Sequence, residues 1–147
     1  MVVYYQKIDL FKMSKKYALA HCIAADARMG GGIAVPFRET FKQQKEILRI
    51  LSTKKEKDQI GIVVPLKFKT RWIYNLITKY DSSKKPAIEN LFKSLIEMKK
   101  HMDENDVVYL AMPKIGAGID GLPWSKIIIK ICDLFDDKKY EVIVCVL

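Results

Sequence analysis

The chain has 147 residues, which allows one folded domain and leaves no room for a second hydrophobic core. Half of the residues are hydrophobic and 29% are charged, so collagen-like, disordered and disulfide-rich proteins are excluded. No apolar run approaches the roughly 20 residues of a membrane helix, and the amino-terminal segment lacks the order of a signal peptide. We therefore expect a soluble monomer without membrane contact, cytoplasmic, or nuclear if its source is eukaryotic.

The formal net charge of +9 allows two interpretations. A basic surface attracts polyanions such as nucleic acid. Alternatively, the lysines form a solvated surface, because they are scattered over most of the chain and no aromatic residues interleave a basic stripe. The charge makes contact with nucleic acid plausible without establishing it.

Cysteine and histidine usage bears on metal binding. Cys22, Cys132 and Cys145 lie among apolar neighbours without CxxC spacing, and His21 and His101 are the only histidines. A structural zinc site needs a cluster of about four such ligands. We expect buried free thiols and no metal site.

Strand-like and helix-like segments alternate along the chain. Residues 2–6 and 17–23 are β-branched, aromatic or apolar runs that predict strands. After three consecutive glycines, residues 33–41 form a helical segment that Pro36 is expected to interrupt, and residues 43–51 have the spacing of an amphipathic helix.

The later part of the chain continues this alternation. It adds, in order, strands at 61–66 and 72–78, a helix at 87–102, a strand at 107–112, a helix at 124–135 and a strand at 141–147. Apolar strands separated by helices indicate a sheet that is covered on both faces. The predicted fold class is therefore α/β, a single three-layer α/β/α sandwich over residues 1–147.

Two glycine-rich loops lie where such a fold binds ligands, beyond the carboxyl ends of strands. Residues 28–33 connect a predicted strand to a helix, and residues 113–120 do the same later in the chain. Glycine allows the backbone to approach an anion and to point several N–H groups at it, and the following helix start adds positive potential. One such loop is often only a tight turn, but two of them favour a ligand with more than one phosphate.

Three charged residues near the same edge have open interpretations. Asp9 is either a helix cap or an acceptor for a base amino group. Lys79, at the end of a predicted strand, is either a solvated lysine, a phosphate partner or a nucleophile. Asp120 follows the second glycine loop, where a carboxylate can serve acid/base chemistry.

Four segments together resemble a known family, the macrodomains. They are HCIAADARMGGGIAVPF, IYNLITK, KPAIENL and MPKIGAGIDGLPW, and the resemblance runs over residues 5–147. The pairing of LITK with a later GxGxD is similar to one branch, the terminal ADP-ribose protein glycohydrolase and bacterial DNA ADP-ribosyl glycohydrolases. Two positions depart from that branch, since Ile8 replaces a glycine and Ala24 replaces a serine.

The resemblance implies a central mixed sheet, an ADP-ribose ligand and no cofactor. Asp9 is expected to accept the adenine amino group, Lys79 to attack the anomeric carbon of the distal ribose, and Asp120 to act as acid and base. The first glycine loop is expected to hold the distal ribose, and the second to wrap the diphosphate. The implied binding set is Asp9, Leu10, His21, Ala24, Arg28, Met29, Gly30, Gly31, Gly32, Ile33, Pro113, Ile115, Gly116, Ala117, Gly118 and Ile119.

The implied activity is release of ADP-ribose from a modified partner: a carboxylate-linked protein, thymidine-linked DNA or O-acetyl-ADP-ribose. A lysine attacks only as a neutral amine. Asp120, which follows the second glycine loop, is expected to accept the proton of Lys79. The main alternative is a module that binds ADP-ribose without cleaving it. A nucleic-acid-binding protein, suggested by the charge of +9, is the third hypothesis.

Overall fold

Six strands form the central layer of the computed structural model, which describes residues 2–147. They are β1 (Val3–Lys7), β2 (Ala18–Ala24), β3 (Ile62–Phe68), β4 (Arg71–Lys79), β5 (Tyr109–Met112) and β6 (Glu141–Val146). Their order across the sheet is β1-β6-β5-β2-β4-β3. Every neighbouring pair is parallel except β3 and β4, which form an antiparallel hairpin. The expected mixed sheet is therefore confirmed.

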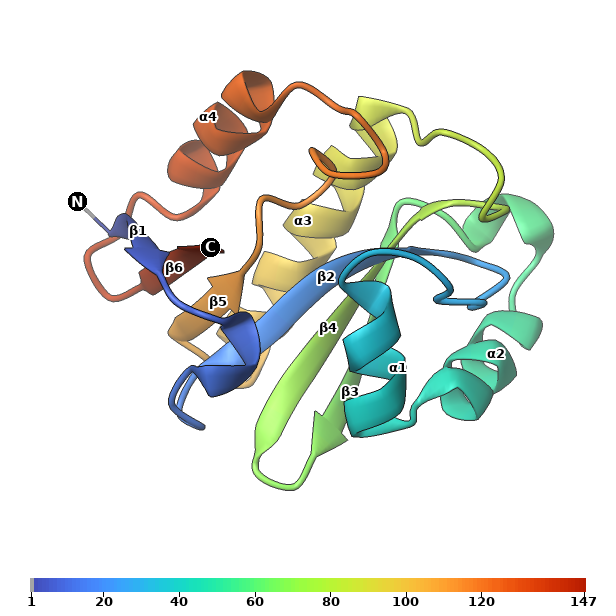
Figure 1. Cartoon of the computed structure of the whole chain (residues 1–147), viewed down its shortest axis with the longest axis horizontal. Helices are drawn as coiled ribbons and strands as arrows, with labels where there is room; N and C mark the ends of the chain where they lie inside the picture. Colours follow the sequence, from blue (N-terminus) through green and yellow to red (C-terminus); the bar gives the residue numbers. More distant parts are fainter. Residues whose placement is uncertain (1) are drawn as a thin grey trace.

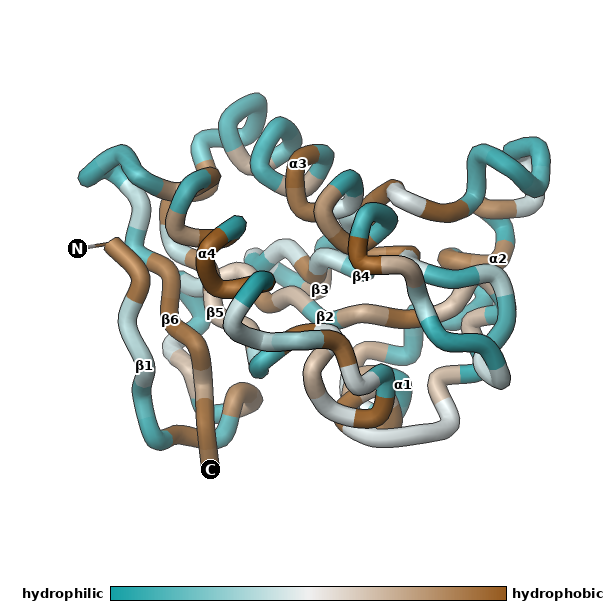
Figure 2. The backbone as a smooth tube through the Cα atoms, turned by 90° about the horizontal axis from the view of Figure 1, so that it is seen from above, coloured by the Kyte–Doolittle hydropathy of each residue, from teal (hydrophilic) through white to brown (hydrophobic). Residues whose placement is uncertain are grey.

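Helices cover both faces of this sheet (Figure 1). They are α1 (Ala34–Phe41), α2 (Gln44–Ser52), α3 (Ile88–Glu104) and α4 (Trp124–Leu134). The buried side chains of α1 and α2 pack with one face of the sheet, and those of α3 and α4 pack with the other. Figure 2 shows α3 and α4 on one side of the strands and α1 on the opposite side. The predicted three-layer α/β/α fold is confirmed.

The alternation of side chains along β4 explains why the central strands are continuous apolar runs in the sequence. Ile73 and Ile77 pack into the core beneath α1 and α2, whereas Tyr74 and Leu76 pack beneath α3 and α4. Because successive side chains of a strand point to opposite faces, a sheet that is covered on both sides requires apolar residues at both parities.

The element bounds differ from the predicted ones by one or two residues, and two short 3₁₀ turns, Leu10–Lys12 and Glu56–Asp58, were not predicted. The expected interruption at Pro36 is absent. Pro36 is the third residue of α1, where its missing N–H has no intrahelical partner to lose. That residues 1–147 form one domain stays a prediction, and residue 1 lies outside the described residues.

The cysteines differ from the expectation of buried thiols. Cys145 is buried, but Cys22 is half-buried and Cys132 is exposed. Cys132 directly follows Ile131, which points into the core from α4, and one residue turns the side chain by about 100° around a helix, here toward solvent. Within residues 2–147, no helix is long and apolar enough to cross a membrane, and no group of three or more potential metal-ligating His, Cys, Asp or Glu side chains occurs.

Candidate functional site

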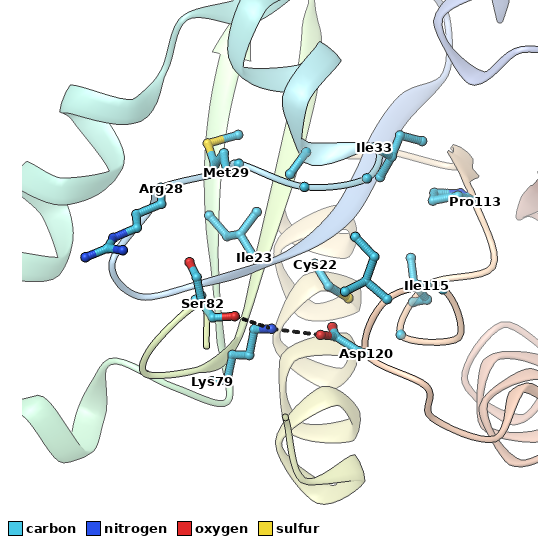
Figure 3. Close-up of a pocket in the computed structure, with 18 of the residues that line it drawn as sticks. Cys22, Ile23, Arg28, Met29, Ile33, Lys79, Ser82, Pro113, Ile115 and Asp120 are labelled. Carbon is cyan, nitrogen blue, oxygen red and sulfur yellow. Dashed lines mark hydrogen bonds and ion pairs between the residues drawn. The ribbon is translucent and has the colours of Figure 1, made fainter. Parts of the chain in front are cut away.

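The two glycine loops enclose a cleft of about 500 Å³ at the carboxyl ends of the central strands. Residues 28–33, between β2 and α1, form one wall, and residues 113–120, between β5 and α4, form most of the other (Figure 3). Lys79 and Ser82 enter the cleft from the end of β4 and the turn that follows it. The loops converge because β5, β2 and β4 are adjacent parallel strands. The volume is typical of a small-molecule site.

One apolar side chain connects the two walls at the mouth of the cleft. Ile119 is 74% exposed, and its Cδ1 atom lies 3.1 Å from where a Cβ atom would stand at either Gly31 or Gly32. A side chain at Gly31 or Gly32 would require the tip of Ile119 to shift by a few tenths of an ångström. Glycine at these positions lets Ile119 lie directly against the first loop.

Gly116 has a different reason for lacking a side chain. Its φ angle is +73°, and a Cβ atom there would lie 3.0 Å from Leu91 and 3.2 Å from Leu122. The turn thus lies directly against α3, and only glycine meets both the backbone and the packing requirement. This close packing sets the path of the chain that carries Asp120 back over the end of β4.

Lys79 and Asp120, which are 41 residues apart in sequence, meet inside the cleft (Figure 3). Lys79 Nζ donates to Asp120 Oδ1 at 2.8 Å and to the carbonyl oxygen of Ser82 at 3.5 Å. The lysine and aspartate side chains are only 13% and 17% exposed. A partly buried ammonium in contact with a carboxylate can pass its proton over one hydrogen bond.

A shift in strand register brings Lys79 to this point. β4 pairs with β2 through Ile77 and Ile23, but the next pair is Lys79 with Ala24, so Thr78 is skipped. Such irregularities change the direction of the side chains that follow and occur often beside active sites. A strict alternation along β4 would place Lys79 on the same face as Ile77.

Cys22 also lines the cleft. Burial raises the pKa of its thiol strongly, and the negative charge of Asp120 raises it further. The thiol is therefore protonated at neutral pH and is a poor nucleophile, since the thiolate is the reactive form.

Most of the predicted binding residues line the cleft, together with Lys79 and Asp120. The lining includes Ala24, Arg28, Met29, Gly30, Gly31, Gly32, Ile33, Pro113, Ile115, Gly116, Gly118 and Ile119. Sequence reasoning did not single out four further lining residues, Ile23, Ala34, Ser82 and Lys114. Ser82 follows Lys79 by three residues in the segment DSSKKP. That segment has the composition of an ordinary turn, so nothing in the sequence indicated that Ser82 lines the cleft.

Four predicted residues do not line the cleft. Leu10 is 3% exposed in the core beneath α1, and Ala117 lies in the turn closed by its N–H to the carbonyl of Lys114. Asp9 caps the 3₁₀ turn, where its Oδ1 accepts from Phe11 N at 2.9 Å. The cap, one of two roles left open for Asp9, is confirmed, and its contact with adenine stays a prediction.

His21 does not line the cleft, because its side chain is fully buried, and its contact with ADP-ribose stays a prediction. The ring stacks on Phe37 of α1 with centroids 3.7 Å apart. Its Nε2 donates to Asn75 Oδ1 at 2.7 Å, since the Asn75 amide nitrogen already donates to the carbonyl of Val64. Nδ1 has no hydrogen-bond partner within the described residues. His21 belongs to the core on the α1 face.

This burial predicts a pH dependence of stability. Burial lowers the pKa of His21 to about 4, although the bond to Asn75 opposes the shift, whereas a histidine in an unfolded chain has a pKa of about 6.5. The unfolded chain therefore binds the extra proton first, and stability falls as the pH drops from 6.5 toward 4. Between pH 6.5 and 5, wild-type protein should lose about 1.5 kcal/mol more than His21→Phe, measured by urea unfolding. Equal losses in the two proteins would contradict this account.

Comparison with known proteins identifies the family. A family model described as the Macro domain matches residues 21–131, and the chain belongs to this family. It is 45% identical over 132 residues to ADP-ribose glycohydrolase OARD1 of Homo sapiens, covering 90% of this chain and 83% of that protein. The resemblance drawn from the sequence motifs is thereby confirmed.

Solved structures show the same fold. The macrodomain of Thermus aquaticus DarG matches with a TM-score of 0.85 at 22% identity, covering 99% of this chain and 98% of that one. Thermosipho africanus DarTG in complex with ADP-ribose matches with a TM-score of 0.76 at 19% identity, covering 90% of this chain and 38% of that one.

Proposed function

We propose that this chain is an ADP-ribose glycohydrolase, a hydrolase that releases ADP-ribose from a modified macromolecule or from O-acetyl-ADP-ribose. The observation that carries the proposal is the contact of 2.8 Å between Lys79 Nζ and Asp120 Oδ1 inside the cleft. A relative that is 45% identical over 90% of the chain carries the name ADP-ribose glycohydrolase, which supports the same activity.

The cleft suits a ligand with two phosphates. Each wall is a glycine loop that leads toward a helix, α1 starting at Ala34 and α4 at Trp124. The first N–H groups of a helix and the glycine backbone attract phosphate oxygens. Gly30 and Gly118 leave open space where a Cβ atom would stand. The diphosphate of ADP-ribose would lie between these loops, with the distal ribose toward Lys79.

In the chemical step, Asp120 first accepts a proton from Lys79. The neutral Nζ then attacks the anomeric carbon of the distal ribose, forming a C–N bond as the bond from that carbon to the leaving group breaks. The electron pair of the broken bond departs with the leaving group, which is a carboxylate in an ester substrate. Asp120 returns its proton to the leaving group. Water then attacks the same carbon as the C–N bond breaks, and a proton of that water passes to the amine, which releases ADP-ribose and restores Lys79.

The rim of the cleft would select the attached group. Arg28, with a side chain that is 78% exposed, lies at the rim. The formal charge of +9 supports access of an anionic partner such as ADP-ribosylated DNA. A carboxylate-linked protein and O-acetyl-ADP-ribose place the same ADP-ribose group in the cleft, so they are the other two candidate substrates.

A panel of three substrates tests the function. We expect the wild-type protein to release ADP-ribose from at least one of three substrates: thymidine-modified single-stranded DNA, glutamate-modified protein and O-acetyl-ADP-ribose. Chromatography would measure the free ADP-ribose. The substrate with the highest kcat/KM names the preferred linkage. Binding of ADP-ribose without release from any of the three would show instead that the chain only recognises this ligand.

A further inference from the structure

The carboxylate of Asp26 joins two segments that border the cleft from different strands. Asp26 follows β2 directly before the first glycine loop, and its side chain reaches the turn after β4. Ser82 N–H donates to Asp26 Oδ2 at 2.7 Å, and the Ser82 hydroxyl donates to Oδ1 at 2.6 Å. Arg28 N–H, in the glycine loop, donates to the same Oδ1 at 3.1 Å. One side chain thus fixes both segments.

The charge state of Asp26 suits this role. Its side chain is 23% exposed, and burial by itself would raise its pKa. The hydrogen bonds from the Ser82 side chain, Ser82 N–H and Arg28 N–H outweigh burial and lower the pKa of the carboxyl group. Asp26 therefore stays ionised at neutral pH and accepts all three bonds, which are stronger for being charge-assisted.

Ser82 connects Asp26 to Lys79. The carbonyl oxygen of Ser82 lies 3.5 Å from Lys79 Nζ, and Asp120 Oδ1 accepts from the same nitrogen at 2.8 Å. The amine is therefore held between two acceptors from separate loops. A lysine side chain has many rotamers, so two acceptors with fixed positions are needed to hold the amine in one place.

Among residues 2–147, the other hydrogen bonds of the side chains in the turn after β4 are local. Asp81 Oδ1 accepts from the N–H and hydroxyl of Ser83, which are in the same turn. These two bonds shape the turn without tying it to the neighbouring strand. The two hydrogen bonds from Ser82 to Asp26 connect the turn to the segment after β2. They therefore determine the direction in which the Ser82 carbonyl points.

We propose that Asp26 is a positioning residue for the lysine step: it anchors Ser82, whose carbonyl oxygen helps hold the Lys79 amine beside Asp120. This inference rests on the proposed glycohydrolase function. Asp26 touches neither the anomeric carbon nor the leaving group, so its contribution lies in turnover and not in the affinity for ADP-ribose. Nothing in the family motif of LITK and GxGxD assigns this role to it.

The test compares Asp26→Ala with Asp26→Asn, using the best substrate of the panel. Asp26→Ala should lower kcat by about 10- to 100-fold, the effect of a displacement of roughly 1 Å at a reacting group. The dissociation constant of ADP-ribose, measured by calorimetry, should change by less than about threefold because the glycine loops remain. Asp26→Asn should recover part of kcat, since its amide oxygen accepts from Ser82 N–H and its NH₂ group donates to the Ser82 hydroxyl. It loses only the bond from Arg28 N–H.

Asp133→Ala is the control, because it removes an exposed carboxylate of α4 that lies outside the turn after β4 and does not line the cleft. It should retain kcat within about twofold. The inference is overturned if Asp26→Ala keeps wild-type kcat, if its defect lies in ADP-ribose affinity alone, or if Asp26→Asn is as slow as the alanine variant. An inactive wild-type protein would refute the proposed function itself, which separates the two failures.

Discussion

Lys79→Ala should abolish release of ADP-ribose while ADP-ribose still binds. The substitution removes the amine that forms the C–N bond, and loss of a covalent nucleophile lowers turnover by about a thousandfold or more. The glycine loops that would hold the diphosphate do not depend on this side chain, so the dissociation constant of ADP-ribose should stay within about threefold. Single-turnover release and calorimetry measure the two quantities.

Lys84→Ala is the matched control for this variant. Lys84 is an exposed lysine of the neighbouring turn and does not line the cleft, so its replacement removes the same charge without removing the amine. The control should keep wild-type turnover. If Lys79→Ala retained a rate close to that of Lys84→Ala, the lysine would have no chemical role, and the cleft would need another nucleophile.

Asp120→Asn should lower kcat by about a hundredfold to ten-thousandfold, the usual range for a lost acid/base group. The amide has nearly the same shape as the carboxylate, so it leaves the cleft intact but cannot take the proton of Lys79, which lies 2.8 Å away. Without this acceptor, the attack on the anomeric carbon loses its acid/base partner. The kcat of the variant on its best substrate measures the loss.

Asp133→Asn, which changes an exposed carboxylate of α4, is the control and should keep wild-type kcat. An Asp120→Asn rate equal to that of wild type would assign the aspartate only a structural role.

The layers of the fold could be predicted from the sequence because they depend on local patterns. The period of the apolar residues distinguishes α3 from β5, and apolar residues at both parities indicated that β4 is covered on both faces. Strand order does not follow from such patterns, since it depends on which long-range pairs form. The 3₁₀ turns were missed because three residues carry too little periodic signal.

The candidate site could be predicted only in part. Glycine loops placed after strands indicated the walls of the cleft, but the meeting of Lys79 with Asp120 came from the family motif. The register shift at Thr78 depends on how β4 pairs with β2. The hydrogen bonds from Ser82 to Asp26 join two segments that are far apart in sequence, and no spacing in the sequence encodes either feature. His21 does not line the cleft although Cys22, Ile23 and Ala24 after it do, because its ring stacks on Phe37 beneath α1, a long-range contact that the sequence does not encode.

Trapping the covalent intermediate is the measurement that tests the central claim most directly. Wild-type protein turning over glutamate-modified protein, in which the ester joins the anomeric carbon, would be quenched with cyanoborohydride. This reagent reduces the imine formed when the C–N adduct opens, and the peptides would then be analysed by mass spectrometry. We predict ADP-ribose attached to the peptide that carries Lys79, at the position of Lys79, and none in Lys79→Ala. Rapid release of ADP-ribose with no trapped adduct, or with the adduct on another residue, would contradict the account.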